Sequence, residues 1–282
     1  MVKLRNISRQ QLIEHISKLC IDANYYIEKD IMRSYKKAFA QETSSIGKKI
    51  LDQIIENVKI AKNNHQPMCQ DTGFAVVFVE LGIDVHLDFD LQEAIDEGVR
   101  QGYKEGYLRK SIVKDPLQRI NTKDNTPAII HLSLVSGNKI KVTVAPKGGG
   151  SENMSAIKML KPSDGVDGVK NFVIDTVDKA GANACPPVIV GVGLGGTFEK
   201  AAILAKKSLL REIGSDNTSS YYNNLEKELL ESINNIGIGP MGLGGKTTAL
   251  DVFINVYPCH IASMPVAVNI QCHSARHKSV EI

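Results

Sequence analysis

The sequence predicts an α/β fold in which mixed sheets are flanked by helices, with a helical region at the N-terminus. Apolar residues recur at helical spacing through residues 8–61. Further along, short apolar runs rich in β-branched residues alternate with longer amphipathic segments, the pattern of buried strands connected by helices. Because no Pro/Ser linker or composition break splits the chain, we expect one domain over residues 1–282, with room for two lobes.

The N-terminal region is predicted to contain three helices. Ser8 and Gln11 form the capping-box pattern that begins the first helix. Cys20 lies on the apolar face of that helix, so we expect this thiol in the core. The second and third helices are expected over residues 23–39 and 45–61.

A buried strand and a glycine-bearing helix are predicted next. Residues 74–81 form a continuous apolar run, which indicates a strand buried on both faces. The helix that begins at Asp90 carries Gly98, Gly102 and Gly106, and each glycine costs roughly 1 kcal/mol relative to Ala. We therefore expect another backbone to approach this helix closely.

The remaining elements are predicted from hydrophobic periodicity and from the positions of glycine and proline. Residues 128–135 and 139–145 are predicted to pair as a hairpin around Gly137. The second strand leads into a triple-glycine loop and a predicted helix over residues 154–160, and exposed N–H groups at such a helix start suit anions. A flexible loop without a ligand also explains the glycines, and the residues alone slightly favour it. Downstream, helices are expected over residues 164–180, 198–213 and 217–232, and strands over residues 188–190, 247–257 and 266–270.

Composition excludes several classes of protein. The chain is 43% hydrophobic and 23% charged with a formal net charge of +3, and no dense Lys/Arg stripe predicts a nucleic-acid surface. No apolar run approaches the roughly 18–20 residues that a membrane span requires, and the N-terminus lacks a secretion signal. We expect a cytoplasmic protein without nucleic-acid or membrane partners.

The cysteines do not form a disulfide pattern. There are five, an odd number at wide spacing: Cys20, Cys69, Cys185, Cys259 and Cys272. In a cytoplasmic protein, catalysis, metal binding or plain burial are the roles that remain.

The stretch from Pro67 to Gly73 places a thiol, an amide and a carboxylate in a row. Cys69, Gln70 and Asp71 lie between a predicted helix and a predicted strand. Asp-Thr-Gly is also ordinary turn chemistry, and a lone cysteine is commonly a small buried hydrophobe. The residues alone leave both interpretations open.

Two glycine motifs suggest nucleotides. Residues 191–196 read G-x-G-x-x-G between a predicted strand and a predicted helix, as in dinucleotide-binding proteins, but no later strand ends in an acidic residue for the ribose. A P-loop would need glycine where Pro240 stands before Gly245 and Lys246. Nicotinamide binding thus remains an alternative, and a P-loop is disfavoured.

Three cysteines share a setting at predicted strand boundaries. Cys69 precedes one strand, Cys185 precedes another, and Cys272 follows a third. Three thiolates can hold a cubane iron–sulfur cluster and leave one iron open as a Lewis acid. Burial of unrelated thiols is the competing explanation, and spacing alone favours it, because five separated cysteines permit ten different triplets.

Several motifs together resemble the iron–sulfur fumarate hydratases of class I, with L(+)-tartrate dehydratase as a near relative. The resemblance covers almost the whole chain. It rests on Met-Cys69-Gln-Asp-Thr-Gly, Leu-Arg109-Lys-Ser, Asp-Asn-Thr-Pro127-Ala, Pro-Lys-Gly-Gly-Gly-Ser-Glu-Asn153, Cys185-Pro-Pro with Gly-Leu-Gly-Gly-Thr197, and His260 through Gln-Cys272-His.

The resemblance implies a [4Fe-4S] cluster and a set of substrate contacts. Its ligands would be Cys69, Cys185 and Cys272, while Cys20 and Cys259 would not bind it. Gln70 and Asp71 would contact substrate, Arg109 would pair with a substrate carboxylate, Gly149 would offer its backbone, and His260 would line the pocket, with Asp71 and His260 as the catalytic candidates.

The resemblance also implies a partner and a substrate class. Single-chain members carry a second domain that this sequence lacks, so the chain is similar to an α subunit that needs a separate β subunit in a hetero-oligomer. The expected reaction interconverts (S)-malate with fumarate and water. Alternatives are an L(+)-tartrate dehydratase α subunit, a nicotinamide-dependent oxidoreductase and a non-catalytic cluster-bearing sensor.

Overall fold

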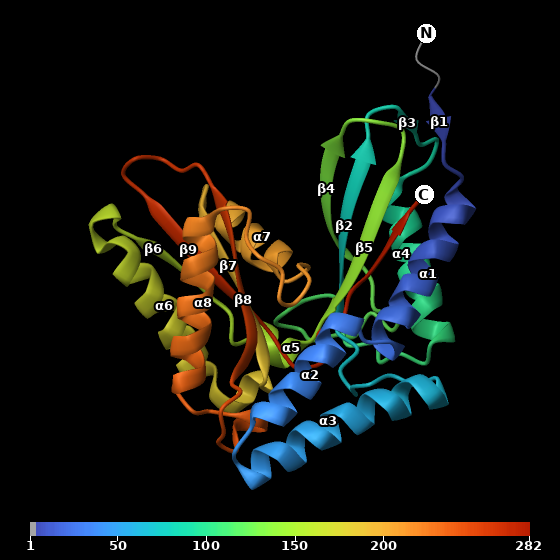
Figure 1. Ribbon diagram of the computed structural model, residues 1–282. Helices are drawn as coiled ribbons and strands as arrows, with labels where there is room; N and C mark the ends of the chain where they lie inside the picture. Colours follow the sequence, from blue (N-terminus) through green and yellow to red (C-terminus); the bar gives the residue numbers. More distant parts are fainter. Residues whose placement is uncertain (1–3) are drawn as a thin grey trace. The chain divides into compact units, whose positions relative to one another are not determined.

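The computed structural model describes residues 4–282 and divides the chain into two compact units (Figure 1). The first unit comprises Met1–Glu28, Asn57–Gly149 and Arg276–Ile282, and the second comprises Lys29–Glu56 and Gly150–Ala275. The chain passes between the units four times: between Glu28 and Lys29, within α3 (Ser45–Asn64), within α5 (Gly149–Glu152), and between Ala275 and Arg276.

The first unit contains a four-stranded mixed sheet in the order β10-β5-β2-β4. β2 (Phe74–Gly82) pairs parallel with β4 (Ile129–Val135) and antiparallel with β5 (Ile140–Lys147). β10 (Lys278–Glu281) pairs antiparallel with β5 at the other edge. The hairpin expected around Gly137 is therefore wrong: β2 lies between the two strands, because β4 pairs with one edge of its apolar run and β5 with the other.

Two helices cover one face of this sheet. α1 (Arg9–Tyr25) begins at Ser8, whose hydroxyl accepts the N–H of Gln11, and α4 (Leu91–Glu105) begins at Asp90. β1 (Arg5–Asn6) pairs parallel with β3 (Val85–His86) in a short two-stranded sheet of the same unit.

The glycines of α4 allow α1 to pack closely. A Cβ on Gly98 would lie 2.5 Å from Ile16 Cβ, and one on Gly102 would lie 2.7 Å from the Ser17 carbonyl. The predicted close approach is confirmed, and Cys20 lies in this core with 0% exposure.

The second unit contains another four-stranded mixed sheet, in the order β6-β9-β7-β8. β7 (Val188–Gly195) pairs parallel with β8 (Ala249–Tyr257) and antiparallel with β9 (Met264–Gln271). β6 (Ala156–Leu160) pairs antiparallel with β9. The helix predicted over residues 154–160 is thus wrong, because pairing with β9 makes this segment an edge strand.

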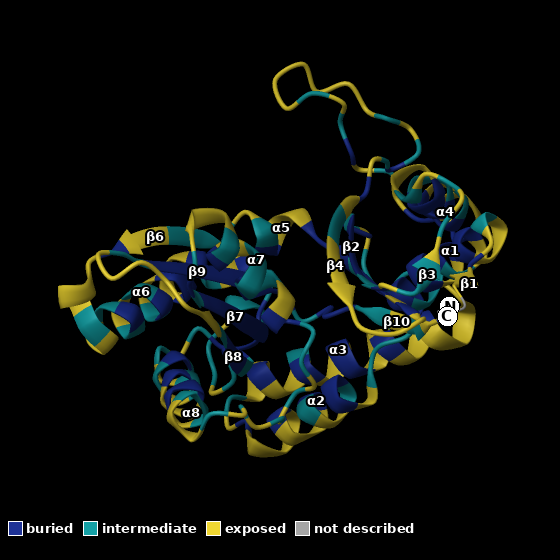
Figure 2. Ribbon diagram, turned by 90° about the horizontal axis from the view of Figure 1, so that it is seen from above, coloured by how far each residue is buried: buried dark blue, intermediate teal, exposed yellow. Residues whose placement is uncertain are grey.

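Helices pack on both faces of the second sheet (Figures 1 and 2), where β7 and β9 are buried strands. Side chains from α6 and α8 join the core on one face, and α7 packs on the other through small residues. The helical elements of this unit are α2 (Lys29–Gln41), α6 (Gly165–Ala180), α7 (Phe198–Ser208) and α8 (Ser220–Asn235), with 3-10 turns at Pro162–Asp164 (η1), Gly181–Ala184 (η2) and Pro240–Gly242 (η3).

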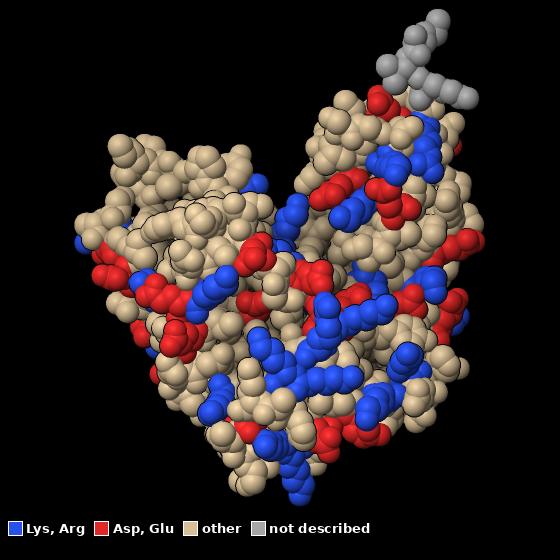
Figure 3. All heavy atoms as spheres, viewed as in Figure 1, with Lys and Arg blue, Asp and Glu red and all other residues tan. Residues whose placement is uncertain are grey.

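The surface carries charges of both signs. Figure 3 shows Lys and Arg side chains sharing one face of the molecule with Asp and Glu. Among residues 4–282, no helix combines the length and apolar character needed to cross a bilayer.

Candidate active site

The loop from Cys69 to Gly73 connects α3 to β2 in the first unit and is held by its backbone. The N–H of Met68 donates to the carbonyl of Asn24 at 3.0 Å, and the Met68 carbonyl accepts from the Asn57 amide at 2.7 Å. These bonds fix the residue just before Cys69. The Cys69 thiol is half-buried and lies 3.3 Å from Oε1 of the exposed Gln70.

Asp71 joins this loop to the triple-glycine loop that follows β5. Its Oδ1 accepts the N–H of Gly73 at 3.0 Å, and its Oδ2 accepts the N–H of Gly149 at 2.8 Å. A carboxylate that accepts two backbone N–H bonds is held in position by them. Two predicted site residues that are far apart in sequence, Asp71 and Gly149, are therefore in direct contact.

The hydroxyl groups of Tyr103 and Thr72 hold the same loop through hydrogen bonds to backbone carbonyls. The buried Tyr103 hydroxyl donates to the carbonyls of Thr72 at 2.8 Å and Gly73 at 3.0 Å. The Thr72 hydroxyl donates to the Arg109 carbonyl at 2.9 Å. The backbone of Arg109 is thus tied to the Asp71 loop while its side chain is exposed, and the guanidinium makes no hydrogen bond or ion pair with residues 4–282.

In the second unit, Cys185 and Cys272 lie on neighbouring segments. Cys185 follows the 3-10 turn η2 in the left-handed conformation, with φ of 53°. The His273 N–H donates to the Cys185 carbonyl at 3.1 Å, and His273 Nδ1 lies 3.1 Å from the same oxygen. Because left-handed backbone is uncommon for a residue with a Cβ, Cys185 occupies a conformation that its surroundings must impose.

Tyr35 supports the Cys272 segment. Its buried phenol donates a hydrogen bond to the carbonyl of His273, and burial, followed by the nearby Cys272 thiol, raises the pKa of Tyr35 well above 10. The phenol therefore stays protonated and serves as a donor that holds the turn after β9.

His260 lies in the exposed turn after β8. Its Nδ1 accepts the N–H of Ala262 at 3.1 Å, and its carbonyl accepts from Ser263 at 2.9 Å. Because Nδ1 is an acceptor, the neutral ring carries its proton on Nε2. His260 thus presents one N–H donor on an otherwise self-contained turn.

The five cysteines differ in burial and in their contacts. All are free thiols, and burial raises the pKa of Cys20 to about 12, which makes it a poor thiolate ligand. Cys259 is exposed and donates to the Ser263 carbonyl at 3.3 Å. Across residues 4–282, no three His, Cys, Asp or Glu side chains are grouped so that they could hold a metal ion.

Comparison with known proteins identifies the family. The model for fumarate hydratase (Fumerase) matches residues 13–281. The chain belongs to this family. It is 47% identical over 268 residues to the "Putative L(+)-tartrate dehydratase subunit alpha" of Methanocaldococcus jannaschii, covering 93% of this chain and 94% of that protein. It is also 32% identical over 277 residues to the L(+)-tartrate dehydratase subunit alpha of Escherichia coli K12, covering 95% and 91%. Family and relatives together indicate a hydro-lyase.

The glycine motif at residues 191–196 has a packing role in this member of the fumarate hydratase family. Gly191 and Gly193 lie within β7 rather than in a turn after it, and only Gly196 follows the strand. A Cβ on Gly191 would lie 2.2 Å from the Ala205 carbonyl, and one on Gly193 would lie 1.9 Å from the Ala201 carbonyl. Glycine is needed there because α7 packs directly on the strand, so the motif does not require a nucleotide.

In the loop that contains Gly245 and Lys246, a backbone N–H group is bonded by a carboxylate of the chain itself. Glu42, buried with 2% exposure, accepts the Lys246 N–H at 2.8 Å, and its other oxygen accepts those of Thr43 and Ser44. A carboxylate of the chain therefore occupies the place that a bound anion would take in a nucleotide-binding loop.

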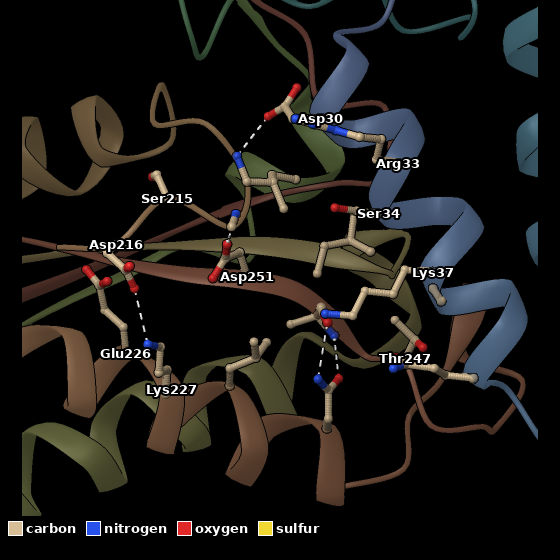
Figure 4. Close-up of a pocket in the computed structure, with 18 of the residues that line it drawn as sticks. Asp30, Arg33, Ser34, Lys37, Ser215, Asp216, Glu226, Lys227, Thr247 and Asp251 are labelled. Carbon is tan, nitrogen blue, oxygen red and sulfur yellow. Dashed lines mark hydrogen bonds and ion pairs between the residues drawn. The ribbon is translucent and has the colours of Figure 1, made fainter.

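A cavity of about 820 Å³ lies in the second unit beside α2 and β8 (Figure 4). Burial raises the pKa of Asp251, one of its carboxyl groups. None of the predicted site residues lines it. Its carboxylates are engaged within the unit: Asp30 accepts the Ile213 N–H at 2.8 Å, Asp251 the Gly214 N–H at 2.7 Å, and Asp216 pairs with Lys227 at 3.1 Å.

Two residues near Asp71 were not singled out from the sequence. The buried Asn125 accepts the Ser111 N–H at 2.8 Å and donates to the Gly73 carbonyl at 3.2 Å, which joins the Arg109 segment to the Asp71 loop. Arg276 is also buried, four residues after Cys272. The Asp-Asn-Thr-Pro motif marked Asn125 as part of the family pattern but gave no indication of this role.

Proposed function

We propose that this chain is the α subunit of a [4Fe-4S]-dependent hydro-lyase that interconverts (S)-malate with fumarate and water. The observation that carries the proposal is the contact of Asp71 Oδ2 with the Gly149 N–H at 2.8 Å. This contact brings the Cys69-Gln70-Asp71 loop and the triple-glycine loop together, as a site that holds both a cofactor and an anionic substrate needs.

The cluster would be held by the thiolates of Cys69, Cys185 and Cys272. The donor set suits the group: all three are free thiols, each lies in a loop rather than on a helix face, and soft thiolates are the usual iron–sulfur ligands. When bound, a cluster with one iron free of protein ligands supplies a Lewis acid toward the substrate hydroxyl.

The substrate is a dianion, and this chain offers groups for it. The guanidinium of Arg109, which has no partner among residues 4–282, can bind one carboxylate through two parallel hydrogen bonds. Gln70 is exposed beside Cys69 and can donate its amide N–H groups, and the backbone at Gly149 lines the same loop. These groups would orient the substrate.

Asp71 and His260 are the proposed proton-transfer residues. Elimination of water needs a base at the carbon and an acid toward the departing hydroxyl, and Asp71 and the Nε2 of His260 are polar groups of suitable chemistry. The two backbone N–H groups that Asp71 accepts hold its carboxylate in one orientation, as a base requires.

A separate β subunit would complete the site. The relatives of this chain are named as α subunits, and they match it over nearly their whole length. We expect a hetero-oligomer in which the α chain alone is inactive. Turnover at the normal rate by the purified, reconstituted α chain would overturn this part of the proposal.

Dehydration of L(+)-tartrate is the second candidate reaction. It is favoured by the names of the two relatives given above, which are L(+)-tartrate dehydratase α subunits, one of them named as putative. Tartrate differs from malate by one hydroxyl, and a site built to hydrogen-bond that hydroxyl rejects the analogue lacking it strongly.

The test is to co-express the chain with a candidate β partner and purify the complex without oxygen. We expect a brown protein whose visible absorbance bleaches in air. Its rate of malate or tartrate conversion should be proportional to that absorbance. A colourless complex that instead reduces or oxidises nicotinamide would favour the oxidoreductase alternative. Retained colour without turnover of any C4 diacid would favour the sensor.

A further inference from the structure

Arg276 is a buried cation that none of the roles above uses. It belongs to the first unit and follows β9 and precedes β10 in the sequence. Only 4% of the residue is exposed. Nη1 donates to Oδ1 of Asn24 at 2.9 Å, while the buried Nε has no hydrogen-bond partner. Asn24 in turn accepts the N–H of Met68, so Arg276 is linked to the backbone next to Cys69.

The guanidinium approaches the Asp71 carboxylate across Gly148. Nη2 of Arg276 lies 3.7 Å, and Oδ2 of Asp71 lies 3.2 Å, from the point that a Cβ on Gly148 would occupy. Both charges also act on Tyr103: burial and the Cys20 thiol raise its pKa, Arg276 lowers it and Asp71 raises it. The absence of a side chain at Gly148 leaves the space between cation and carboxylate open.

A guanidinium removed from water needs compensation. Arg276 makes no ion pair with any of residues 4–282, and one neutral amide accepts from it. Burying a charge with so few partners is costly, and unsatisfied buried groups are found where function requires them. Asp71 is the carboxylate that Arg276 approaches across Gly148, so the opposite charges attract each other there.

We propose that Arg276 is a positioning residue whose charge holds the Asp71 carboxylate in its orientation toward the Gly149 N–H. The inference deepens the proposed function and depends on it. Arg276 acts through Asp71 and is too buried to bind substrate as the exposed Arg109 does.

The test compares two substitutions that separate charge from hydrogen bonding. Arg276→Lys keeps the charge, whereas Arg276→Gln keeps an amide donor for Asn24 and removes the charge. In the complex with the β subunit, we expect Arg276→Gln to lower kcat roughly 100-fold with KM nearly unchanged, because misplacing a catalytic group by about 1 Å has that effect. The kcat of Arg276→Lys should be roughly tenfold higher than that of Arg276→Gln, because lysine keeps the positive charge. Arg9→Gln, at an exposed ion pair with Glu93 in the same unit, is the matched control and should leave kcat unchanged.

A second measurement does not depend on activity. In the full-length chain alone, hydrogen exchange at the Gly149 N–H should be faster in Arg276→Gln than in Arg276→Lys, while exchange within β2 and β5 stays the same. Equal kcat for the two variants, a change confined to KM, or unchanged exchange at Gly149 would overturn the inference. If the unaltered complex turns over no C4 diacid, the proposed function fails and the exchange measurement still decides the role of Arg276.

Discussion

Each of the two units contains a four-stranded sheet with the same pattern of strand pairing, but the loops at the ends of the strands carry different residues. In each, an inner strand pairs parallel with one neighbour and antiparallel with the other: β2 with β4 and β5, and β7 with β8 and β9. An outer strand, β10 or β6, then pairs antiparallel with the second inner strand. The outer strand comes last in the first unit and first in the second.

This pairing brings the same two loops together in each unit. The start of β2 lies opposite the end of β5 (Phe74 with Lys147), and the start of β7 lies opposite the end of β9 (Ile189 with Gln271). The loops beyond those ends therefore meet. In the first unit they are joined by the contact of Asp71 with Gly149, and in the second by that of His273 with Cys185.

The residues at the shared position differ in chemistry. The first unit places one thiol there with an amide, a carboxylate and nearby guanidinium groups, whereas the second places two thiols there, with the Tyr35 phenol beneath them. Strand pairing therefore determines where a site can form, and the residues of the loops determine its chemistry.

The largest expected effect is loss of any proposed cluster ligand. Cys69→Ala, Cys185→Ala and Cys272→Ala should each lower activity of the complex by roughly 1000-fold or more, because the Lewis acid is lost with the metal. Iron content and visible absorbance after anaerobic reconstitution measure the loss. Cys259→Ser, at an exposed thiol, is the control. Full iron content in the Cys69 variant would show that the thiol of the first unit has no part in the site.

Next in size is the effect of Asp71→Asn. We expect kcat to fall roughly 100- to 1000-fold, because the amide cannot accept a proton, while iron content stays unchanged. Steady-state kinetics of the complex provide the measurement, and Asp88→Asn, on the exposed surface of the same unit, is the matched control. Wild-type kcat in Asp71→Asn would assign proton transfer to the second unit or to the partner.

Glu42→Gln should destabilise the second unit in a pH-dependent way. Burial by itself raises the pKa of Glu42, but the N–H donors of Ser44, Lys246, Thr43 and Thr247 outweigh it and lower the pKa below its ordinary 4.5. The carboxylate thus contributes stability above about pH 4.5, and this is lost as pH falls through the lower folded pKa.

We expect Glu42→Gln to lower the free energy of unfolding at pH 7 by about 2 kcal/mol, since hydrogen bonds to a charged group are lost. The difference from wild type should shrink as the pH is lowered below about 4.5 in urea titrations. Glu231→Gln, at an exposed position on α8, should change nothing. A difference that grows in acid would contradict the assigned sign.

The smallest effect is expected for Tyr35→Phe. Removing the hydroxyl leaves the His273 carbonyl without its buried donor and should lower the free energy of unfolding by about 1 kcal/mol. Chemical denaturation provides the measurement, with Tyr221→Phe on the exposed surface as control. Equal stability of the two variants would mean that the second unit holds its loop without the phenol.

Local signals predicted much of the fold. Caps at Ser8 and Asp90, the glycine spacing of α4 and the buried run of β2 all act within a few residues, and each is found in the structure. The hairpin around Gly137 and the helix over residues 154–160 were wrong because strand partners are chosen across the chain. A short apolar segment carries no mark of which strand it will join.

For the site, the sequence by itself determined which residues carry the chemistry: the motifs around Cys69, Arg109, Gly149, Cys185, His260 and Cys272 are recognisable without coordinates. Only the tertiary structure decided which of them touch. The contact of Asp71 with the Gly149 N–H and the burial of Arg276 across Gly148 depend on β2 pairing with β5, a register set by packing over long sequence separations. Residue type is a local property of the chain, whereas proximity is a property of the folded sheet.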